Sequence, residues 1–333
     1  MESIQFKAMQ ISEKEKGVFE RNIISRNTSD LPDGDVLIKI SYSSLNYKDA
    51  LSSIGNKGVT RQYPHTPGID AAGIVTQSSA SLFKTGDEVI VTGYDLGMNT
   101  AGGFGEYIRV PADWVVPCPD SLSLKESMIY GTAGFTAALS VYKLIGSGVT
   151  PEDGEILVTG ATGGVGSIAV SILKSLGYEV IAATGKIHEK ELLQSIGAKD
   201  IIDRSELNDS SNRPMLKSRW AGVIDTVGGN TLSTALKMTN YSGSVTCCGN
   251  VSAHEFTSSI YPFILRGISL LGIDSVQCPM DLRKVIWANL ATSWKIDNIN
   301  SNVTEVSLEK LNDRIDLILA GKHVGRTIIN HNL

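Results

Sequence analysis

The segment EILVTGATGGVGSIAVSILKSLG, Glu155–Gly177, decides the fold of the chain. An apolar strand runs directly into Gly160, Gly163 and Gly166, and a helix of small residues follows. Glycines at such a turn let the backbone approach a pyrophosphate closely, while the helix N-terminus supplies amide donors and a partial positive charge. The spacing is G-x-x-G-x-x-G and not the usual G-x-G-x-x-G, so the motif alone is a weak signal. It becomes a strong signal because it lies between a predicted strand and a predicted helix. It predicts a dinucleotide-binding turn; the alternative is a turn that only packs the helix on the sheet.

The residues after this motif continue the alternation of strand and helix. Short apolar strands are expected at 156–159, 179–183, 200–202, 222–225, 244–248 and 268–272, with segments of crossover length between the first four. Short, mostly apolar strands are typical of a parallel sheet that is buried on both faces. Six of them predict a doubly wound α/β fold, the Rossmann arrangement.

The first 120 residues have a different character, with short strands separated by turns. Strands are expected at 35–45, 68–77, 87–94 and 102–111, and the first follows a Pro-Asp-Gly turn. This half predicts an irregular β-barrel. A helix should follow at 123–145, where Ser123 and Glu126 form a capping box. The last fifty residues predict two helices, at 281–294 and 308–319, and a strand at 325–330.

Composition excludes several classes of protein. With 42% hydrophobic and 20% charged residues the chain is not disordered, and a net charge of −5 argues against nucleic acid as a partner. The sequence contains no run of 18 apolar residues, so no membrane span is predicted. Its first 17 residues carry charges where a signal peptide would be apolar. We therefore expect a cytoplasmic protein. The four cysteines show no C-x-x-C spacing, so neither disulfides nor a zinc site are expected.

Two further places carry candidate functional residues. The second strand of the α/β half ends in Thr184-Gly185-Lys186, without the acid that would bind the ribose of NAD, and Arg204 follows the third strand. A hydroxyl and two cations suit the 2′-phosphate of NADPH, although both cations could be ordinary surface residues. In the first half the candidates are Asn46-Tyr47-Lys48-Asp49, which also reads as a plain strand-to-helix turn, and the loop 55–67 with Lys57, Arg61 and His65.

Taken together, five segments resemble the medium-chain dehydrogenase/reductase superfamily over essentially the whole chain: SSLNYKDAL (43–51), YPHTPGIDAAG (63–73), YGTAGFTAALSV (130–141), VTGATGGVGS (158–167) and YPFILRGISLLGIDSV (261–276). Within it the chain resembles the zinc-free quinone oxidoreductase branch and its quinone oxidoreductase/acrylyl-CoA reductase family. The resemblance implies a GroES-like β-barrel catalytic domain, 1–124 completed by 276–333, and a Rossmann NADPH-binding domain, 125–275, with the cofactor in the cleft. It also implies a homodimer joined through the edge strand 268–274.

The same resemblance implies the site residues. The expected cofactor contacts are Tyr47, Gly163, Gly164, Val165, Gly166, Ser167, Thr184, Gly185, Lys186, Arg204, Asn250, Ile264, Ser275 and Arg326. The chain departs from the zinc alcohol dehydrogenases, because Asn46-Tyr47 stands where they have a cysteine ligand and Gly68-Ile69-Asp70 where they have G-H-E. We therefore expect no metal.

The activity implied is NADPH-dependent reduction of a small molecule: a quinone, or the activated C=C bond of an enone or an enoyl thioester such as acrylyl-CoA. Tyr47 is the candidate catalytic residue, either donating the second proton or only contacting the cofactor. A thioester would need cations such as Lys57 or Arg61 for its phosphates, whereas a quinone needs an apolar slot, and the sequence does not separate the two. The alternative is a non-catalytic NADPH-binding or redox-sensing protein.

Overall fold

The computed structural model describes residues 3–333 and divides them into two compact units. The β unit holds the chain up to Thr132 together with Val276–Ala291 and Asn298–Leu333, and the α/β unit holds Ala133–Ser275 and Thr292–Asp297. No helix among residues 3–333 is both long and apolar enough to cross a membrane.

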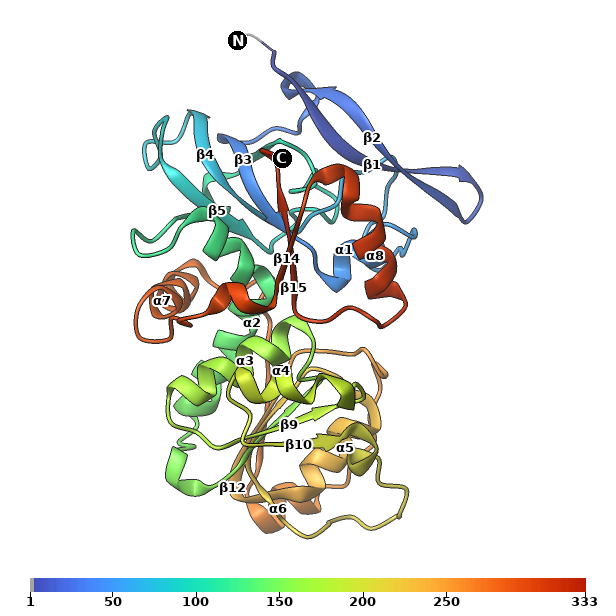
Figure 1. Cartoon of the computed structure of the whole chain (residues 1–333), viewed down its shortest axis with the longest axis vertical. Helices are drawn as coiled ribbons and strands as arrows, with labels where there is room; N and C mark the ends of the chain where they lie inside the picture. The colour runs from blue at the N-terminus through green and yellow to red at the C-terminus, as the bar shows by residue number, and fades with distance from the viewer. Residues whose placement is uncertain (1–2) are drawn as a thin grey trace. The chain divides into compact units, whose positions relative to one another are not determined.

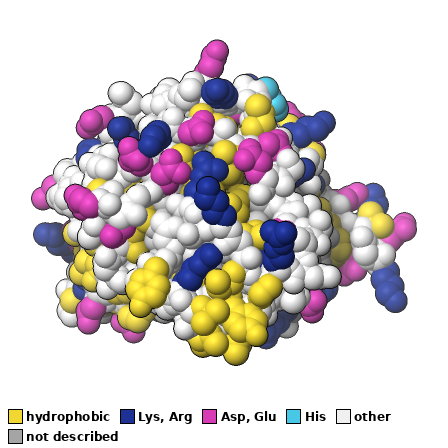
Figure 2. Space-filling view, turned by 90° about the horizontal axis from the view of Figure 1, so that it is seen from below, with side chains coloured by type: hydrophobic (Ala, Val, Ile, Leu, Met, Phe, Trp, Pro, Cys, Tyr) yellow, Lys and Arg dark blue, Asp and Glu magenta, His cyan; other side chains and the backbone are white. Residues whose placement is uncertain are grey.

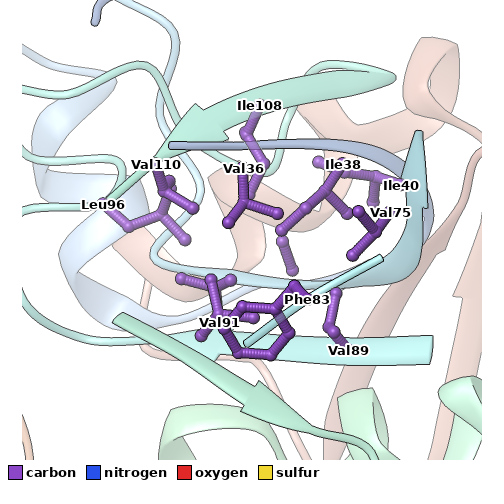
Figure 3. Packing of buried hydrophobic residues seen from close by; sticks show 12 residues of the cluster. Val36, Ile38, Ile40, Val75, Phe83, Val89, Val91, Leu96, Ile108 and Val110 are labelled. Atoms are coloured by element: carbon purple, nitrogen blue, oxygen red, sulfur yellow. The ribbon is translucent and has the colours of Figure 1, made fainter. Parts of the chain in front are cut away.

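The β unit is built on one seven-stranded sheet. Its strands run in the order β14 (Val303–Val306), β15 (Arg326–Asn330), β3 (Val36–Ser44), β4 (Asp70–Ser78), β5 (Glu88–Thr92) and β7 (Val115–Pro117), and β6 (Tyr107–Val110) pairs with β3. Only β14 and β15 are parallel. Alternate side chains from β3 to β7 point into one buried apolar cluster, so that the strands wrap around it (Figure 3). This is the barrel that the alternating strands predicted.

A long hairpin and helix α8 pack against α1 (Tyr47–Ser52). The hairpin consists of β1 (Gln5–Glu15) and β2 (Val18–Asn27), and it extends away from the seven-stranded sheet (Figure 1). Helix α8 (Leu311–Leu319) contacts α1, and residues of β1, α1 and α8 share one buried cluster. Helix α7 (Met280–Ala291) belongs to the same unit. Helix α1 is therefore held between elements from both ends of the chain.

Helix α2 (Leu124–Gly146) is the predicted capped helix, but it is not continuous. Gly131 adopts φ 49° and ψ −155°, so the helix breaks there into two segments. The N-terminal cap is as expected: Glu126 accepts from the backbone N–H of Ser123 at 2.9 Å, and Ser123 Oγ accepts from Glu126 N–H at 3.1 Å. The chain passes from one unit to the other immediately after this break.

The α/β unit contains the predicted parallel sheet. Its order is β10 (Asp200–Asp203), β9 (Val180–Thr184), β8 (Ile156–Thr159), β11 (Trp220–Asp225), β12 (Thr239–Cys247) and β13 (Ser269–Gly272). In chain order this is 3-2-1-4-5-6, the Rossmann arrangement. The connections carry α3 (Gly164–Ser175), α4 (Lys190–Ser195), α5 (Gly229–Met238) and α6 (Tyr261–Arg266). The predicted fold class is confirmed.

Short 3-10 helices fill several connections: Thr28–Asp30, Ala112–Trp114, Pro151–Asp153, Ile187–Glu189, Arg204–Leu207, Ile299–Asn302 and Leu308–Lys310. The last of these changes one prediction, because the helix expected at 308–319 is a 3-10 turn followed by α8. The hairpin β1–β2 and strand β14 were not predicted from the sequence.

Candidate cofactor and catalytic site

The glycine turn of the α/β unit connects β8 to α3, as its sequence predicts. Gly160 has φ +60°, and a Cβ there would collide with Thr226 Oγ1. A Cβ on Gly166 would collide with the carbonyl oxygen of Gly160, so the helix can approach the turn only because this residue is glycine. Two of the three glycines are thus required by the backbone itself.

The N-terminus of α3 presents backbone donors at this turn. The first bond of the helix runs from Ser167 N–H to the Gly163 carbonyl at 2.9 Å. The amides of Gly164, Val165 and Gly166 lie in the first turn of this twelve-residue helix. At this N-terminal end the helix dipole favours an anion. These residues fit a dinucleotide pyrophosphate.

The carboxyl end of β9 lies beside this turn and brings together the residues predicted for cofactor choice. Thr184 Oγ1 is 3.1 Å from Thr162 Oγ1 and accepts from Lys186 N–H at 3.0 Å. Arg204 packs against Gly185, where a Cβ would lie 2.7 Å from Arg204 Nε. The side chain of Arg204 can therefore lie across the end of β9 only because residue 185 is a glycine.

Lys186 is half-buried at the same place. Burial lowers the pKa of its ammonium group, and the nearby carboxylate of Glu189 opposes this shift. A cation that loses hydration in this way gains more from a bound anion than a fully solvated lysine does.

The remaining predicted contacts of this unit are only partly brought together. Asn250 and Ser275 follow β12 and β13, and so lie beyond the carboxyl ends of parallel strands, the edge at which the glycine turn follows β8. Ile264 is on α6. Arg266 of the same helix donates to the carbonyl of Leu216, which lies just before β11, and to the carbonyl of Thr239, the first residue of β12. The structure thus places Ile264 towards the amino ends of the strands, not beside the glycine turn.

One buried acid at this edge was not singled out from the sequence. Asp225 ends β11, accepts from Thr159 Oγ1 at 2.8 Å and from Gly228 N–H at 2.8 Å, and is fully buried. Burial raises the pKa of this carboxyl, against the hydrogen bonds that lower it. Asp225 holds the loop after β11 against β8, next to the glycine turn.

In the β unit, Tyr47 is the first residue of α1, and its side chain is 42% exposed. Asn46 and Asp49 on either side of it are buried, whereas Lys48 is half-buried. Asp49 accepts from the backbone amides of Asn46 (2.8 Å), Ile69 (2.9 Å) and Gly68 (3.1 Å). Burial and the charge of Asp70 raise the pKa of Asp49 to about 7, against these three amide donors.

Asp70, at the start of β4, gathers four donors around a fully buried carboxylate. It accepts from Ser44 Oγ at 2.5 Å, from Asn46 Nδ2 at 2.7 Å, and from Thr132 through N–H at 2.8 Å and Oγ1 at 2.5 Å. Thr132 directly follows the break in α2, so the second half of that helix begins on this carboxylate. Apart from a glycine within the predicted helix, no feature of the sequence indicates this convergence.

Arg326, at the start of β15, closes the same group from the other side. Its Nε donates to the carbonyl of Ile129 (2.8 Å), one terminal nitrogen to Asn46 Oδ1 (3.2 Å) and the Leu45 carbonyl (3.4 Å), and the other to Ser44 Oγ (2.9 Å). Only 4% of the residue is exposed. Protein groups thus enclose Arg326 almost completely, and its role as a cofactor contact stays a prediction. We call Ser44, Asn46, Asp70, Thr132 and Arg326 the Asp70 cluster.

The loop 55–67 holds its predicted cations differently. Lys57 Nζ lies 4.6 Å from the ring centre of Tyr63 and 6.0 Å from that of Phe19, and donates to the carbonyl of Arg61 at 3.3 Å. Arg61 itself is exposed. His65 is buried with Nε2 2.9 Å from the Gly97 carbonyl, and burial lowers its pKa. Of the three, Arg61 is the best placed to meet an anion from solvent.

Within residues 3–333 no group of three or more His, Cys, Asp or Glu side chains is arranged to hold a metal ion. Burial raises the pKa of Cys118 and of Cys248 to about 12, so both thiols stay protonated at neutral pH.

Comparison with known proteins assigns both halves of the chain. Residues 32–120 match the alcohol dehydrogenase GroES-like domain, and residues 164–291 match the domain described as zinc-binding dehydrogenase. Acrylyl-CoA reductase AcuI of Ruegeria pomeroyi is 40% identical over 320 residues, covering 96% of this chain and 97% of its own.

Solved structures agree with this assignment. The protein YhfP of Bacillus subtilis, whose name places it provisionally among quinone oxidoreductases, is 46% identical, and the match covers 98% of this chain and 99% of YhfP. Its crystal structure with NAD bound matches with a TM-score of 0.95. The YhdH oxidoreductase of Salmonella enterica, solved in complex with NADP, is 41% identical with a TM-score of 0.94, covering 98% of this chain and 99% of its own. The chain is therefore an oxidoreductase that belongs to the quinone oxidoreductase branch of the medium-chain dehydrogenases/reductases.

Proposed function

We propose that the protein is an NADPH-dependent, zinc-independent reductase of small molecules that carry an activated C=C bond, such as enoyl thioesters of the acrylyl-CoA type, or of quinones. The observation that carries the cofactor assignment is Arg204 lying across Gly185 at the end of β9, where a 2′-phosphate would meet a guanidinium. The NADP-bound Salmonella structure supports it, whereas the Bacillus structure holds NAD.

When bound, NADPH supplies a hydride to the β-carbon of the substrate. The amides of Gly164–Gly166 would hold the pyrophosphate, with Lys186 and Arg204 at the 2′-phosphate. Tyr47 would donate its phenolic proton to the α-carbon of the resulting enolate, and solvent would return a proton to the phenolate. Phenols remain protonated at neutral pH, and positioned general acids contribute roughly 10²–10⁴-fold to the rate.

Replacing Tyr47 by Phe tests this role, because it keeps the ring and removes the acid. We expect kcat with an enoyl thioester to fall about a hundredfold, with little change for a quinone. A small loss confined to the KM for NADPH would instead show that Tyr47 only contacts the cofactor.

The assembly that we propose is a homodimer in the cytoplasm. We keep the expected domain boundaries at 124/125 and 275/276, beside the division of the structure into compact units at 132/133 and 275/276. Strand β13 ends the parallel sheet, and an unpaired edge invites pairing with a second copy. The neighbouring α6 exposes Ile264 and Leu265, and hydrophobic side chains gather on this face of the α/β unit (Figure 2). Light scattering at micromolar concentration should find a dimer, and only monomer would refute it.

A further inference from the structure

The side-chain amide of Asn46 lies between a buried anion and a buried cation. Its Nδ2 donates to the carboxylate of Asp70 at 2.7 Å, and its Oδ1 accepts from the guanidinium of Arg326 at 3.2 Å. An amide has one donor end and one acceptor end, so opposite charges on its two sides define a single orientation. Hydrogen bonds to charged groups are also stronger than those between neutral groups. The two charges therefore hold the side-chain amide of Asn46 in one orientation, and we call this contact of Asn46 with Asp70 and Arg326 the clamp.

Ser44 joins the two charges on a second path. Its hydroxyl accepts from Arg326 at 2.9 Å and donates to Asp70 at 2.5 Å. Asp70 and Arg326 are 0% and 4% exposed, so each would be a costly isolated charge if its partners moved away. Their shared partners thus resist displacement, which makes the group rigid.

The main chain of Asn46 carries this rigidity into α1. Its carbonyl accepts from the amides of Asp49 at 3.1 Å and Ala50 at 3.3 Å, and its own N–H donates to the Asp49 carboxylate at 2.8 Å. The next residue is Tyr47, whose side chain leaves the buried region and is 42% exposed. The backbone that Asn46 fixes sets the position and direction of the Cα–Cβ bond from which the phenol projects.

We propose that the Asp70 cluster is a positioning device for the reaction, in which Asp70 and Arg326 act through the amide of Asn46 to hold Tyr47 in its productive place. This inference rests on the proposed function of Tyr47 as the proton donor. Asp70 and Arg326 are positioning residues and not contacts of substrate or cofactor. A misplacement of a catalytic group by about 1 Å can cost about a hundredfold in rate, which gives the device its value.

A double-mutant cycle between residues 46 and 47 tests the proposal. Asn46→Ala should lower kcat with an enoyl thioester roughly ten- to a hundredfold, while the KM for NADPH stays within about twofold. In the Tyr47→Phe background the same substitution should have no further effect on kcat, because it acts only through the phenol. Effects on kcat that simply add would overturn the proposal, since a merely structural role predicts them.

Two neighbouring serines supply a matched control. Ser43 and Ser44 are both fully buried, but the Ser43 hydroxyl donates to the backbone carbonyl of Asp70 at 2.6 Å, outside the clamp. Ser43→Ala loses one buried hydrogen bond, of about 1 kcal/mol, whereas Ser44→Ala loses two bonds to charged groups, so Ser44→Ala should be the less thermally stable of the two. Only Ser44→Ala should lower kcat. Equal kcat values for the two variants would contradict the proposal.

Hydrogen exchange of the amides of α1 gives a readout without turnover, and it avoids Arg326 variants that could fail to fold. We expect Asn46→Ala and Ser44→Ala to speed exchange in the peptide 46–53, and Ser43→Ala to leave it unchanged. If Tyr47→Phe proves fully active while exchange behaves as stated, the proton-donor role fails and the clamp stands. If Tyr47→Phe is impaired and exchange in 46–53 is the same in all variants, the positioning inference fails alone.

Discussion

At the scale of single residues, we expect Gly185 to be as important to the proposed cofactor site as Arg204 beside it. A Cβ at this position would lie 2.7 Å from Arg204 Nε, and the backbone conformation places no strain on an alanine. Gly185→Ala should therefore displace Arg204 and raise the NADPH dissociation constant about tenfold, since a charge-assisted hydrogen bond is worth roughly 1.5–3 kcal/mol. NADH binding should be nearly unchanged.

Titration of both dinucleotides into wild-type protein, Gly185→Ala and Arg204→Ala measures this. Lys186→Ala should resemble Arg204→Ala. Equal losses for NADPH and NADH would mean that these residues do not read the 2′-phosphate.

Asp49 links the stability of the β unit to pH. Its pKa is about 7 in the folded protein, whereas an unfolded chain has an ordinary value near 4. Between these values the folded state binds more protons, so the Asp49 contribution to the free energy of unfolding falls as pH rises from about 4 to 7. Above pH 7 it is constant. Urea unfolding of wild type and Asp49→Asn across this range isolates the contribution, because asparagine does not titrate. A contribution that rises with pH would show that the three backbone amides outweigh burial.

The local geometry of the candidate α/β site could be predicted at the residue scale, because its signals are local. Gly160, Gly163 and Gly166 mark their turn by spacing alone. The Asp70 cluster could not be found in this way, since Asp70 and Arg326 lie 256 residues apart in the sequence. Only the packing of four separate segments brings them together, and that packing also enclosed Arg326 where a cofactor contact was expected.

At the scale of elements, the break in α2 at Gly131 is required by the side chains of Asp70 and Ser44 that pack against it. A Cβ on Gly131 would lie 2.5 Å from both Asp70 Oδ2 and Ser44 Oγ, in a backbone region that strains any other residue. Gly131→Ala should destabilise the protein by at least about 1–3 kcal/mol. Gly146→Ala, at the end of the same helix with no atom near its Cβ position, is the control and should be neutral or stabilising by up to ~1 kcal/mol. Chemical unfolding of both variants measures the difference, and equal effects would refute the account of the break.

The elements themselves were predicted to different degrees for physical reasons. Strands β8 to β11 are short apolar runs, so their signal survives in the sequence alone. The hairpin β1–β2 was missed because its outer end, around Gly17, is exposed and highly charged, although Gly17 at φ +81° marks its turn. Helix α2 was predicted as one piece, since its apolar period continues through Gly131.

At the scale of the whole molecule, the activity that we propose draws on residues of both units. In this proposal the α/β unit would supply the backbone donors and cations for a dinucleotide, and the β unit would supply Tyr47 beside the buried charges of the Asp70 cluster. This division follows from the chain order, which places the Rossmann sheet between two parts of the β unit.

The measurement that tests the central claim most directly is oxidation of NADPH by the purified protein, treated with a chelator, against acrylyl-CoA, crotonyl-CoA, a simple enone and a benzoquinone. We predict turnover with at least one of these acceptors, a clear preference for NADPH over NADH, and no loss on chelation. Tight binding of NADPH without oxidation by any acceptor would contradict the account and favour a protein that only binds the cofactor. Activity that is lost to the chelator and restored by zinc would contradict it as well.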